Sequence, residues 1–163
     1  MSALIIFVIL NFMAATSGGI FTPDEWYRQL KKPDWIPPDW VFPTVWLVLY
    51  MINAFAGWQV WQVAGGDGIG FWAMVIYGVA LTLNAGWSAV FFGFKLIRLA
   101  IVEASLLWVA IAVQAILFFQ IVPWAGLLVL PYLLWVSIAI FLNYTVWRLN
   151  PEVSGDHVNA SST

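Results

Sequence analysis

Residues 99–122 read LAIVEASLLWVAIAVQAILFFQIV, an apolar run that contains one charged side chain, Glu103. An α-helix rises about 1.5 Å per residue, so about 20 apolar residues cross the hydrocarbon core of a bilayer. Inside that core every backbone N–H and C=O group needs a partner, and a helix pairs them within one segment. This stretch therefore predicts a membrane-spanning helix.

Four other runs have the same character, and none contains an aspartate, glutamate, lysine or arginine. They cover residues 3–21, 41–64, 69–94 and 124–147. Of the 163 residues, 63% are hydrophobic and 9% are charged, whereas about 25% are charged in a typical soluble domain. We therefore expect an all-α integral membrane protein, a five-transmembrane-helix bundle forming one domain over residues 1–150. A short polar tail, residues 151–163, is expected to be disordered.

The composition excludes several kinds of chemistry. The chain has no cysteine, and its single histidine, His157, lies in the polar tail. Disulfides and a His/Cys metal site are therefore not expected. A net charge of −2 does not provide the basic face that nucleic-acid binding requires. No catalytic dyad or triad is visible, so we assign no catalytic residue of the usual kind.

The basic residues are distributed asymmetrically. Five spans place the first connection, the third connection and the C-terminal end on one side. All six lysines and arginines fall there: Arg28, Lys31, Lys32, Lys95, Arg98 and Arg148. Positive residues concentrate on the cytoplasmic side of membrane proteins, so we expect the N-terminus outside and the C-terminus in the cytoplasm. Apolar helices favour a bacterial cytoplasmic membrane, although the sequence alone leaves an outer membrane open.

The first connection, residues 22–40, is rich in charge, proline and aromatic residues. Thr22 and Pro23 are typical of the cap and the first position of a helix, which predicts a short helix as far as Leu30 or Lys31. The prolines that follow prevent further helix and stiffen the return to the next span. Two interpretations fit the aromatic residues. An interfacial aromatic belt is the commoner arrangement, whereas a stiff loop favours a lid over a pocket between the helices.

Helical spacing places aromatic and amide side chains on shared faces of three spans. These faces are Trp46, Tyr50 and Asn53; Asn84, Trp87 and Phe91; and Trp135, Ala139, Leu142 and Asn143. A single asparagine in hydrocarbon is most simply explained by a hydrogen bond between helices. Taken together, three such faces predict an aromatic pocket for a flat, rigid and mostly apolar ligand.

Two further features have simple explanations. Ala85, Ala89 and Gly93 repeat small residues every four positions, which predicts either a homodimer seam or tight packing within one chain. Glu103 lies about one turn inside its span on the side of Arg98. We expect its carboxylate to reach Arg98 or the lipid headgroups, and we give it no catalytic role.

Four motifs carry a family resemblance. The first is W-Y-x-x-L-x-K-P-x-W-x-P-P-x-W at residues 26–40, and V-F-P-x-x-W follows at residues 41–46. The third is N-x-x-W-S-x-x-F-F-G at residues 84–93. The last, within residues 131–150, combines P-Y-L-x-W with A-x-x-L-N-Y-x-V-W-R-x-N. In this order the motifs resemble the TspO/MBR family, the translocator proteins that are called tryptophan-rich sensory proteins in bacteria.

The resemblance implies five transmembrane helices, often in a homodimer, and a pocket that opens towards the first connection. Members of the family bind porphyrins, notably protoporphyrin IX, as well as sterols and isoquinoline- or benzodiazepine-type ligands. It thus implies a porphyrin as ligand and no required cofactor. Matched motif by motif, the pocket residues are Trp26, Tyr27, Trp35, Pro38, Trp46, Asn84, Trp87, Ser88, Phe91, Trp135, Ala139 and Leu142, and the faces described above add Tyr50 and Asn143.

The family's sterol-recognition motif resembles Leu142, Tyr144 and Arg148 in this chain. Patterns of this kind are weak. An interfacial end to the last span, with its aromatic and basic residues at the headgroups, is the simpler explanation.

Three functions are compatible with these features. The favoured one is a receptor or sensor of porphyrins, which the resemblance links to tetrapyrrole metabolism and stress responses. The second is light-dependent porphyrin breakdown, in which the excited macrocycle supplies the reactivity and Trp26, Tyr27 and Trp135 would be the oxidisable neighbours. The third is transport of tetrapyrroles, sterols or other lipids. The sequence argues against transport, because it lacks the repeats and mid-membrane charges typical of transporters.

Overall fold

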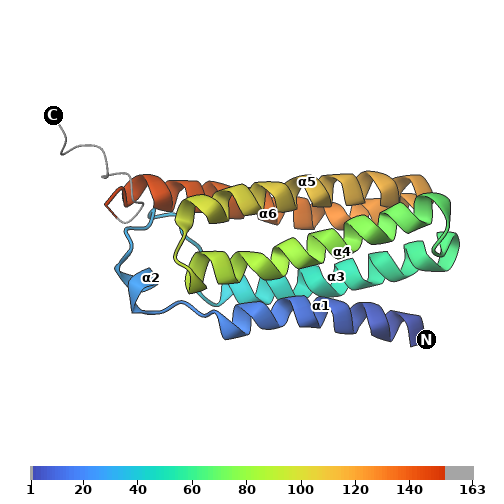
Figure 1. Cartoon of the computed structure of the whole chain (residues 1–163), viewed down its shortest axis with the longest axis horizontal. Coiled ribbons are helices and arrows are strands. Elements are labelled where there is room, and N and C mark those ends of the chain that lie inside the picture. Colours follow the sequence, from blue (N-terminus) through green and yellow to red (C-terminus); the bar gives the residue numbers. More distant parts are fainter. Residues whose placement is uncertain (1, 153–163) are drawn as a thin grey trace.

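The structure is a computed structural model that describes residues 2–152. Five long helices run along one another, and a short helix lies at one end of the bundle (Figure 1). The elements are α1 (Ser2–Ile20), α2 (Glu25–Gln29), α3 (Val41–Ala64), α4 (Gly68–Ser88), the π-helical turn η1 (Ala89–Gly93), α5 (Ile97–Ile121) and α6 (Pro123–Leu149). The prediction of five helices able to span a membrane is confirmed. Residues 153–163 of the predicted tail lie outside the described residues.

The long helices form a closed ring. α1 packs against α3 and α4, α6 packs against α3 and α5, and α4 contacts α5. α3 also touches α4 and α5 across the centre. The N-terminus of α1 lies at the opposite end from α2 and from the end of α6 (Figure 1). The first connection, the α4–α5 loop and the end of α6 therefore meet at one end of the bundle, which we call the lid end.

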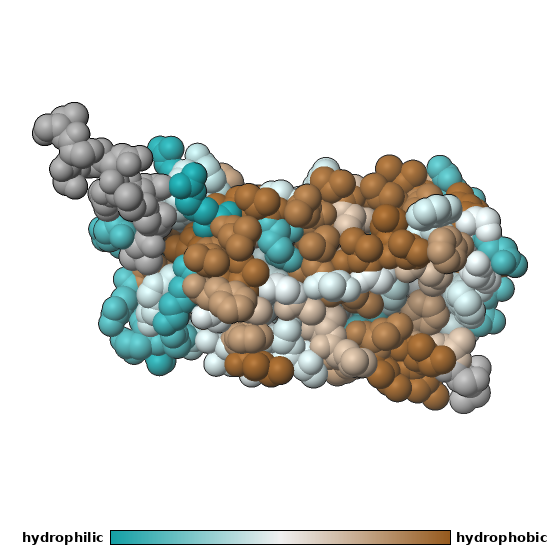
Figure 2. Space-filling model, viewed as in Figure 1, coloured by the Kyte–Doolittle hydropathy of each residue, from teal (hydrophilic) through white to brown (hydrophobic). Residues whose placement is uncertain are grey.

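The outer surface of the helices is hydrophobic. Hydrophilic residues gather at the two ends of the bundle and leave an apolar band between them (Figure 2). At most 39% of the most hydrophobic window of any span is buried inside the protein, so most residues of each window are partly or fully exposed on the bundle surface. Such a surface would be unstable in water and is matched by lipid tails. The chain is an integral membrane protein.

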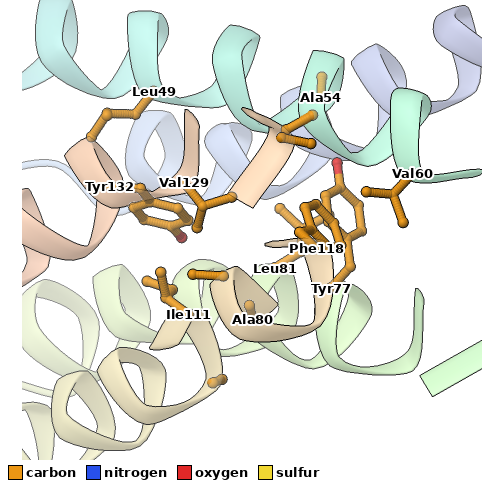
Figure 3. Packing of buried hydrophobic residues seen from close by; sticks show 14 of the residues in the cluster. Leu49, Ala54, Val60, Tyr77, Ala80, Leu81, Ile111, Phe118, Val129 and Tyr132 are labelled. Carbon is orange, nitrogen blue, oxygen red and sulfur yellow. The ribbon is translucent and has the colours of Figure 1, made fainter. Parts of the chain in front are cut away.

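Small residues bring the helices close together at the centre of the bundle. Ala56, Ala73 and Ala80 are completely buried. A Cβ added to Gly57 of α3 would lie 2.8 Å from the ring of Tyr77 on α4, so this contact between two helices needs a glycine. The ring of Tyr77 stacks on Phe118 of α5, and the two lie together in the core (Figure 3).

The short helix α2 differs from its sequence prediction. Its N-cap is Asp24, whose carboxylate accepts the backbone N–H of Tyr27 at 3.2 Å. The prediction that Thr22 caps the helix and Pro23 begins it is wrong, because the Asp24 side chain reaches the same kind of donor two residues later. The helix also ends at Gln29, since Leu30 turns to an extended backbone and buries its side chain against the bundle.

The end of α4 widens into the π-helical turn η1, which the sequence analysis did not predict. The backbone N–H of Phe94 donates to the carbonyl of Ala89 at 2.8 Å, five residues back. Lys95 then adopts a left-handed backbone with φ of 60°, which turns the chain into α5. Single π-helical turns often occur at functional sites. Here the turn carries Phe91, the residue at the centre of the site described next.

Candidate ligand site beneath the lid

The segment 22–40, which we call the lid, packs onto the lid end of the bundle. Leu30 is buried there among residues of η1, α5 and α6. We call this set the lid cluster. It comprises the buried Leu30, Phe91, Ile97, Ala100, Leu142 and Val146 and the partly buried Trp26, Tyr27, Ile36, Phe42, Trp87, Val90, Phe92 and Trp147. Trp26 and Tyr27 therefore fold over the ends of the helices instead of forming an interfacial belt.

Phe91 is the centre of the lid cluster and is 3% exposed. Its ring stacks on Trp87 with centroids 5.2 Å apart. Trp26 and Tyr27 of α2 meet it edge-on at 5.9 and 6.0 Å. Edge-to-face and offset-stacked rings are the favourable arrangements for aromatic pairs. The sequence analysis assigned these residues of α2, α4 and η1 to one site, and their rings are in contact in the structure.

A second aromatic group lies on α3 and α6. Trp46 stacks on Tyr50 at 5.6 Å and meets Tyr132 edge-on at 6.0 Å. Phe42 meets Trp135 edge-on at 5.8 Å, and Phe42 also packs on the lid cluster. Phe42 therefore links Trp135 of α6 to the lid cluster.

Below these rings, Tyr50 and Asn84 hold helices together. The Tyr50 hydroxyl donates to the Asn84 side-chain carbonyl, and the Asn84 amide donates to the Tyr132 hydroxyl at 2.7 Å. The network joins α3, α4 and α6. Interhelical hydrogen bonding, the simpler of the two explanations for a membrane asparagine, is thus confirmed for Asn84. Ser88 on the same helix is buried and lies close to Gly18 of α1.

A second polar network crosses the middle of the membrane span. Gln114 of α5 donates to the Asn53 carbonyl at 2.7 Å, and Asn53 of α3 donates to the Asn11 carbonyl of α1 at 3.1 Å. Asn11 in turn donates to the hydroxyl of Tyr77 on α4. The sequence analysis singled out Asn53 and missed the other members. An asparagine or glutamine within an apolar run is the sequence signal that points to Asn11 and Gln114.

Three buried nitrogen atoms, between the middle of the last span and its lid end, make no hydrogen bond to any described residue. They are Nε1 of Trp135, Nδ2 of Asn143 and Nε1 of Trp147. All three lie on α6, and Ala139 sits one turn from both Trp135 and Asn143. A buried donor without a partner is costly, and such groups in a native site commonly await a ligand or a water molecule.

Some predicted site residues lie elsewhere. Trp35 is 46% exposed and stacks on Phe141, itself 61% exposed, on the outer face of α6. Pro38 is also exposed. The structure therefore does not bring these two together with the lid cluster, and the belt interpretation describes Trp35 better. The residues of the sterol motif are likewise divided, because Leu142 is buried in the cluster whereas Tyr144 and Arg148 are exposed.

The lid is fastened to α6 by Asn150. Its side-chain carbonyl accepts the backbone N–H of Lys31 at 2.8 Å, and its amide donates to the Lys31 carbonyl at 2.9 Å. The same amide donates to the Val146 carbonyl at 2.7 Å, and Asn150 is 2% exposed. This amide therefore joins the middle of the lid to the end of the last helix.

Charges secure the other side of the lid. Lys95 of the α4–α5 loop pairs with Asp24 at 2.8 Å and lies 5.5 Å from the ring of Trp26. The hydrogen bond from Lys95 lowers the pKa of the Asp24 carboxyl below its ordinary value. Burial against the end of the bundle raises the pKa of the Tyr27 hydroxyl, and Lys32 lies 4.2 Å from the centre of that ring. Basic side chains thus surround the aromatic cluster.

Two apolar grooves open on the membrane-facing surface, away from the lid cluster. The larger, about 650 Å³, lies between α1 and α4 and includes Ala85 among its walls. The smaller, about 330 Å³, lies between α3 and α6 and includes Trp135. Gly93 packs within the chain, since a Cβ there would lie 2.8 Å from the ring of Phe21. A homodimer through Ala85, Ala89 and Gly93 remains a prediction.

Glu103 does not reach Arg98. Both carboxylate oxygens of Glu103 are shielded from solvent and make no hydrogen bond to a described residue. One of them lies against α4, 3.5 Å from where a Cβ of Gly86 would be. The prediction that it reaches Arg98 is wrong because the side chain points sideways towards α4 instead of along α5 to the lid end.

Replacing Asn150 with leucine is expected to loosen the lid at Lys31. Two hydrogen bonds to the lid backbone are lost, each contributing about 1 kcal/mol, so amide exchange at Lys31 should accelerate by about tenfold or more. Hydrogen–deuterium exchange by mass spectrometry in lipid nanodiscs measures this rate. Asn150→Asp keeps an acceptor for the Lys31 N–H and should give an intermediate rate. Equal exchange in wild type and Asn150→Leu would show that this amide does not hold the lid.

Comparison with known proteins agrees with this arrangement. The chain matches the family model described as TspO/MBR family over residues 6–148. It is 39% identical over 148 residues to the tryptophan-rich sensory protein of Cereibacter sphaeroides, covering 88% of this chain and 91% of the relative. It is 36% identical over 150 residues to the human translocator protein, covering 86% and 89%. Protein CrtK of Rhodobacter capsulatus is 35% identical over 138 residues, covering 85% and 86%. With five apolar helices, a tryptophan-rich lid end and a match along nearly its whole length, the chain belongs to the TspO/MBR family of membrane proteins.

Proposed function

We propose that this chain is a membrane receptor for porphyrins of the protoporphyrin IX type and signals the state of tetrapyrrole metabolism. The observation that carries the proposal is the set of buried, unpaired nitrogen donors of Trp135, Asn143 and Trp147 on the helix that packs against the aromatic lid cluster. Indole and phenyl faces suit a flat macrocycle, and unpaired donors suit its polar substituents. Release of the lid would open the cluster to the ligand.

The distribution of charge supports the same proposal. Lys32 and Lys95 lie over rings of the lid, and Arg98 lies over Trp147. A porphyrin with carboxylate side chains would place its apolar ring among the aromatic residues and its anionic groups near these cations. By the positive-inside rule the lid end would face the cytoplasm, with the N-terminus outside.

The continuity of the helices is more consistent with a receptor than with a transporter. Secondary transporters commonly have discontinuous helices near the middle of the membrane. In the described part of the chain all five spans are continuous, and the only π-helical turn lies at the lid end of α4. Sensing by binding beneath a lid requires no such break.

Titration with protoporphyrin IX in the dark tests the proposal. In nanodiscs, wild-type protein should shift the porphyrin absorption band and quench tryptophan fluorescence saturably. Tyr27→Ala removes a ring that contacts Phe91 and should weaken binding about tenfold. Phe71→Ala, which removes a half-exposed ring in the first turn of α4, at the end of the bundle opposite the lid, is the matched control and should bind normally. Absence of saturable binding in wild type, or equal affinity in Tyr27→Ala and wild type, would reject this site.

A further inference from the structure

We propose that Asn143 and Trp147 form a polar subsite that binds one carboxylate of the ligand at the lid end of the α5–α6 interface. This inference rests on the proposed porphyrin receptor and adds the chemical group that the protein selects. The subsite does not require the basic residues that are exposed on the lid.

Asn143 and Trp147 present their unpaired donors from the same face of α6. They are four residues apart, so their side chains lie one above the other on one side of the helix. Asn143 is 3% exposed, and its amide nitrogen makes no hydrogen bond to a described residue. The indole nitrogen of Trp147 is equally shielded and equally without a partner. A carboxylate has two oxygens and accepts from two such donors at once.

A positively charged side chain, that of Arg98, lies beside the indole of Trp147. The guanidinium carbon of Arg98 lies 5.7 Å from the centre of the Trp147 ring, so a positive charge flanks the indole from α5. The subsite therefore combines two neutral donors with a positive charge, which favours an anion over an uncharged acceptor.

The subsite also lies under the lid. Leu142 and Val146, the neighbours of these donors on α6, pack in the lid cluster with Leu30. Asn150, one turn beyond, fastens Lys31. A carboxylate bound here would be shielded from water when the lid is closed, which strengthens its hydrogen bonds. Lid opening would give it a route from the membrane surface.

The experiment compares three porphyrins in the dark, with the ligand absorption band as the readout. Protoporphyrin IX carries two carboxylates, its dimethyl ester carries none in ionised form, and etioporphyrin lacks the carboxyl groups entirely. Wild-type protein should prefer protoporphyrin IX to both neutral porphyrins by about tenfold or more. Asn143→Leu and Trp147→Phe should each lower the affinity for protoporphyrin IX about tenfold and change the affinity for etioporphyrin less than about twofold.

Trp58→Phe is the matched control. Its indole nitrogen is also shielded and unpaired among the described residues, but it lies in the second half of α3, beside Phe55 and Trp124. Its porphyrin preference should equal that of wild type. Trp147→Phe retains an aromatic ring, so it tests the subsite even where Asn143→Leu does not fold.

Two results would overturn the subsite alone. One is wild-type protein that binds all three porphyrins with equal affinity. The other is variants that lose affinity for charged and neutral porphyrins alike, which indicates a structural role or a donor pair occupied by water. If wild type binds none of the three porphyrins, the proposed receptor function fails and the subsite fails with it.

Discussion

Phe91→Ala is expected to release the lid and to weaken porphyrin binding by at least about 100-fold. Removing a buried phenylalanine ring destabilises its surroundings by about 3 to 5 kcal/mol, and every tenfold in affinity corresponds to about 1.4 kcal/mol. Trp26, Tyr27 and Trp87 all pack on this ring, so its loss removes the ring that these residues of α2 and α4 share. Hydrogen exchange in residues 24–31 reports lid release, and porphyrin titration in the dark reports affinity.

Phe94→Ala is the matched control for this prediction. Phe94 is three residues away, is 69% exposed and follows directly after η1, in the connection between η1 and α5. Its replacement should leave both exchange and affinity close to wild type. If Phe91→Ala exchanges its lid amides at the wild-type rate, the aromatic cluster does not hold the lid.

Asn53→Leu is expected to lower the free energy of unfolding by about 3 kcal/mol. The substitution leaves the Gln114 amide and the Asn11 carbonyl without their partner in hydrocarbon, and each unpaired buried group costs about 1 to 3 kcal/mol. Hydrogen bonds between membrane helices are individually weak, so most of the loss comes from these two stranded groups. Unfolding in mixed micelles followed by far-ultraviolet circular dichroism measures it.

Thr82→Val provides the comparison. The Thr82 hydroxyl is exposed and donates to the carbonyl of Gly78 in its own helix, so its removal strands no group on another helix. A change below about 0.5 kcal/mol is expected. A loss in Asn53→Leu no larger than that in Thr82→Val would mean that the network joining α1, α3 and α5 adds nothing to stability.

The sequence predicted the spans well because the bilayer imposes both a length and a composition on them. Helical spacing also predicted which side chains meet within one helix. Trp87 and Phe91 are four residues apart and stack, although η1 changes the helix type between them. Tyr27 of the lid joins them because its ring is too apolar to remain in water.

Contacts between distant segments were harder to predict. Asn150 and Lys31 are separated by 119 positions, and nothing local to either residue indicates the other. Trp35 lies in the same aromatic and proline-rich segment as Trp26, yet its ring lies outside the lid cluster and stacks on the exposed Phe141. The cap of α2 was misplaced because Thr22 and Asp24 are both good caps, and residue preference alone does not decide between them.

The bond between Asn150 and Lys31 has a consequence for the order in which the protein matures. Lys31 leaves the ribosome early, whereas Asn150 is translated only after every transmembrane segment has been made. A nascent chain therefore cannot fasten its lid before the last helix is inserted. Fastening of the lid at Lys31 thus follows completion of the last helix, and a translation product interrupted before Asn150 would lack this attachment.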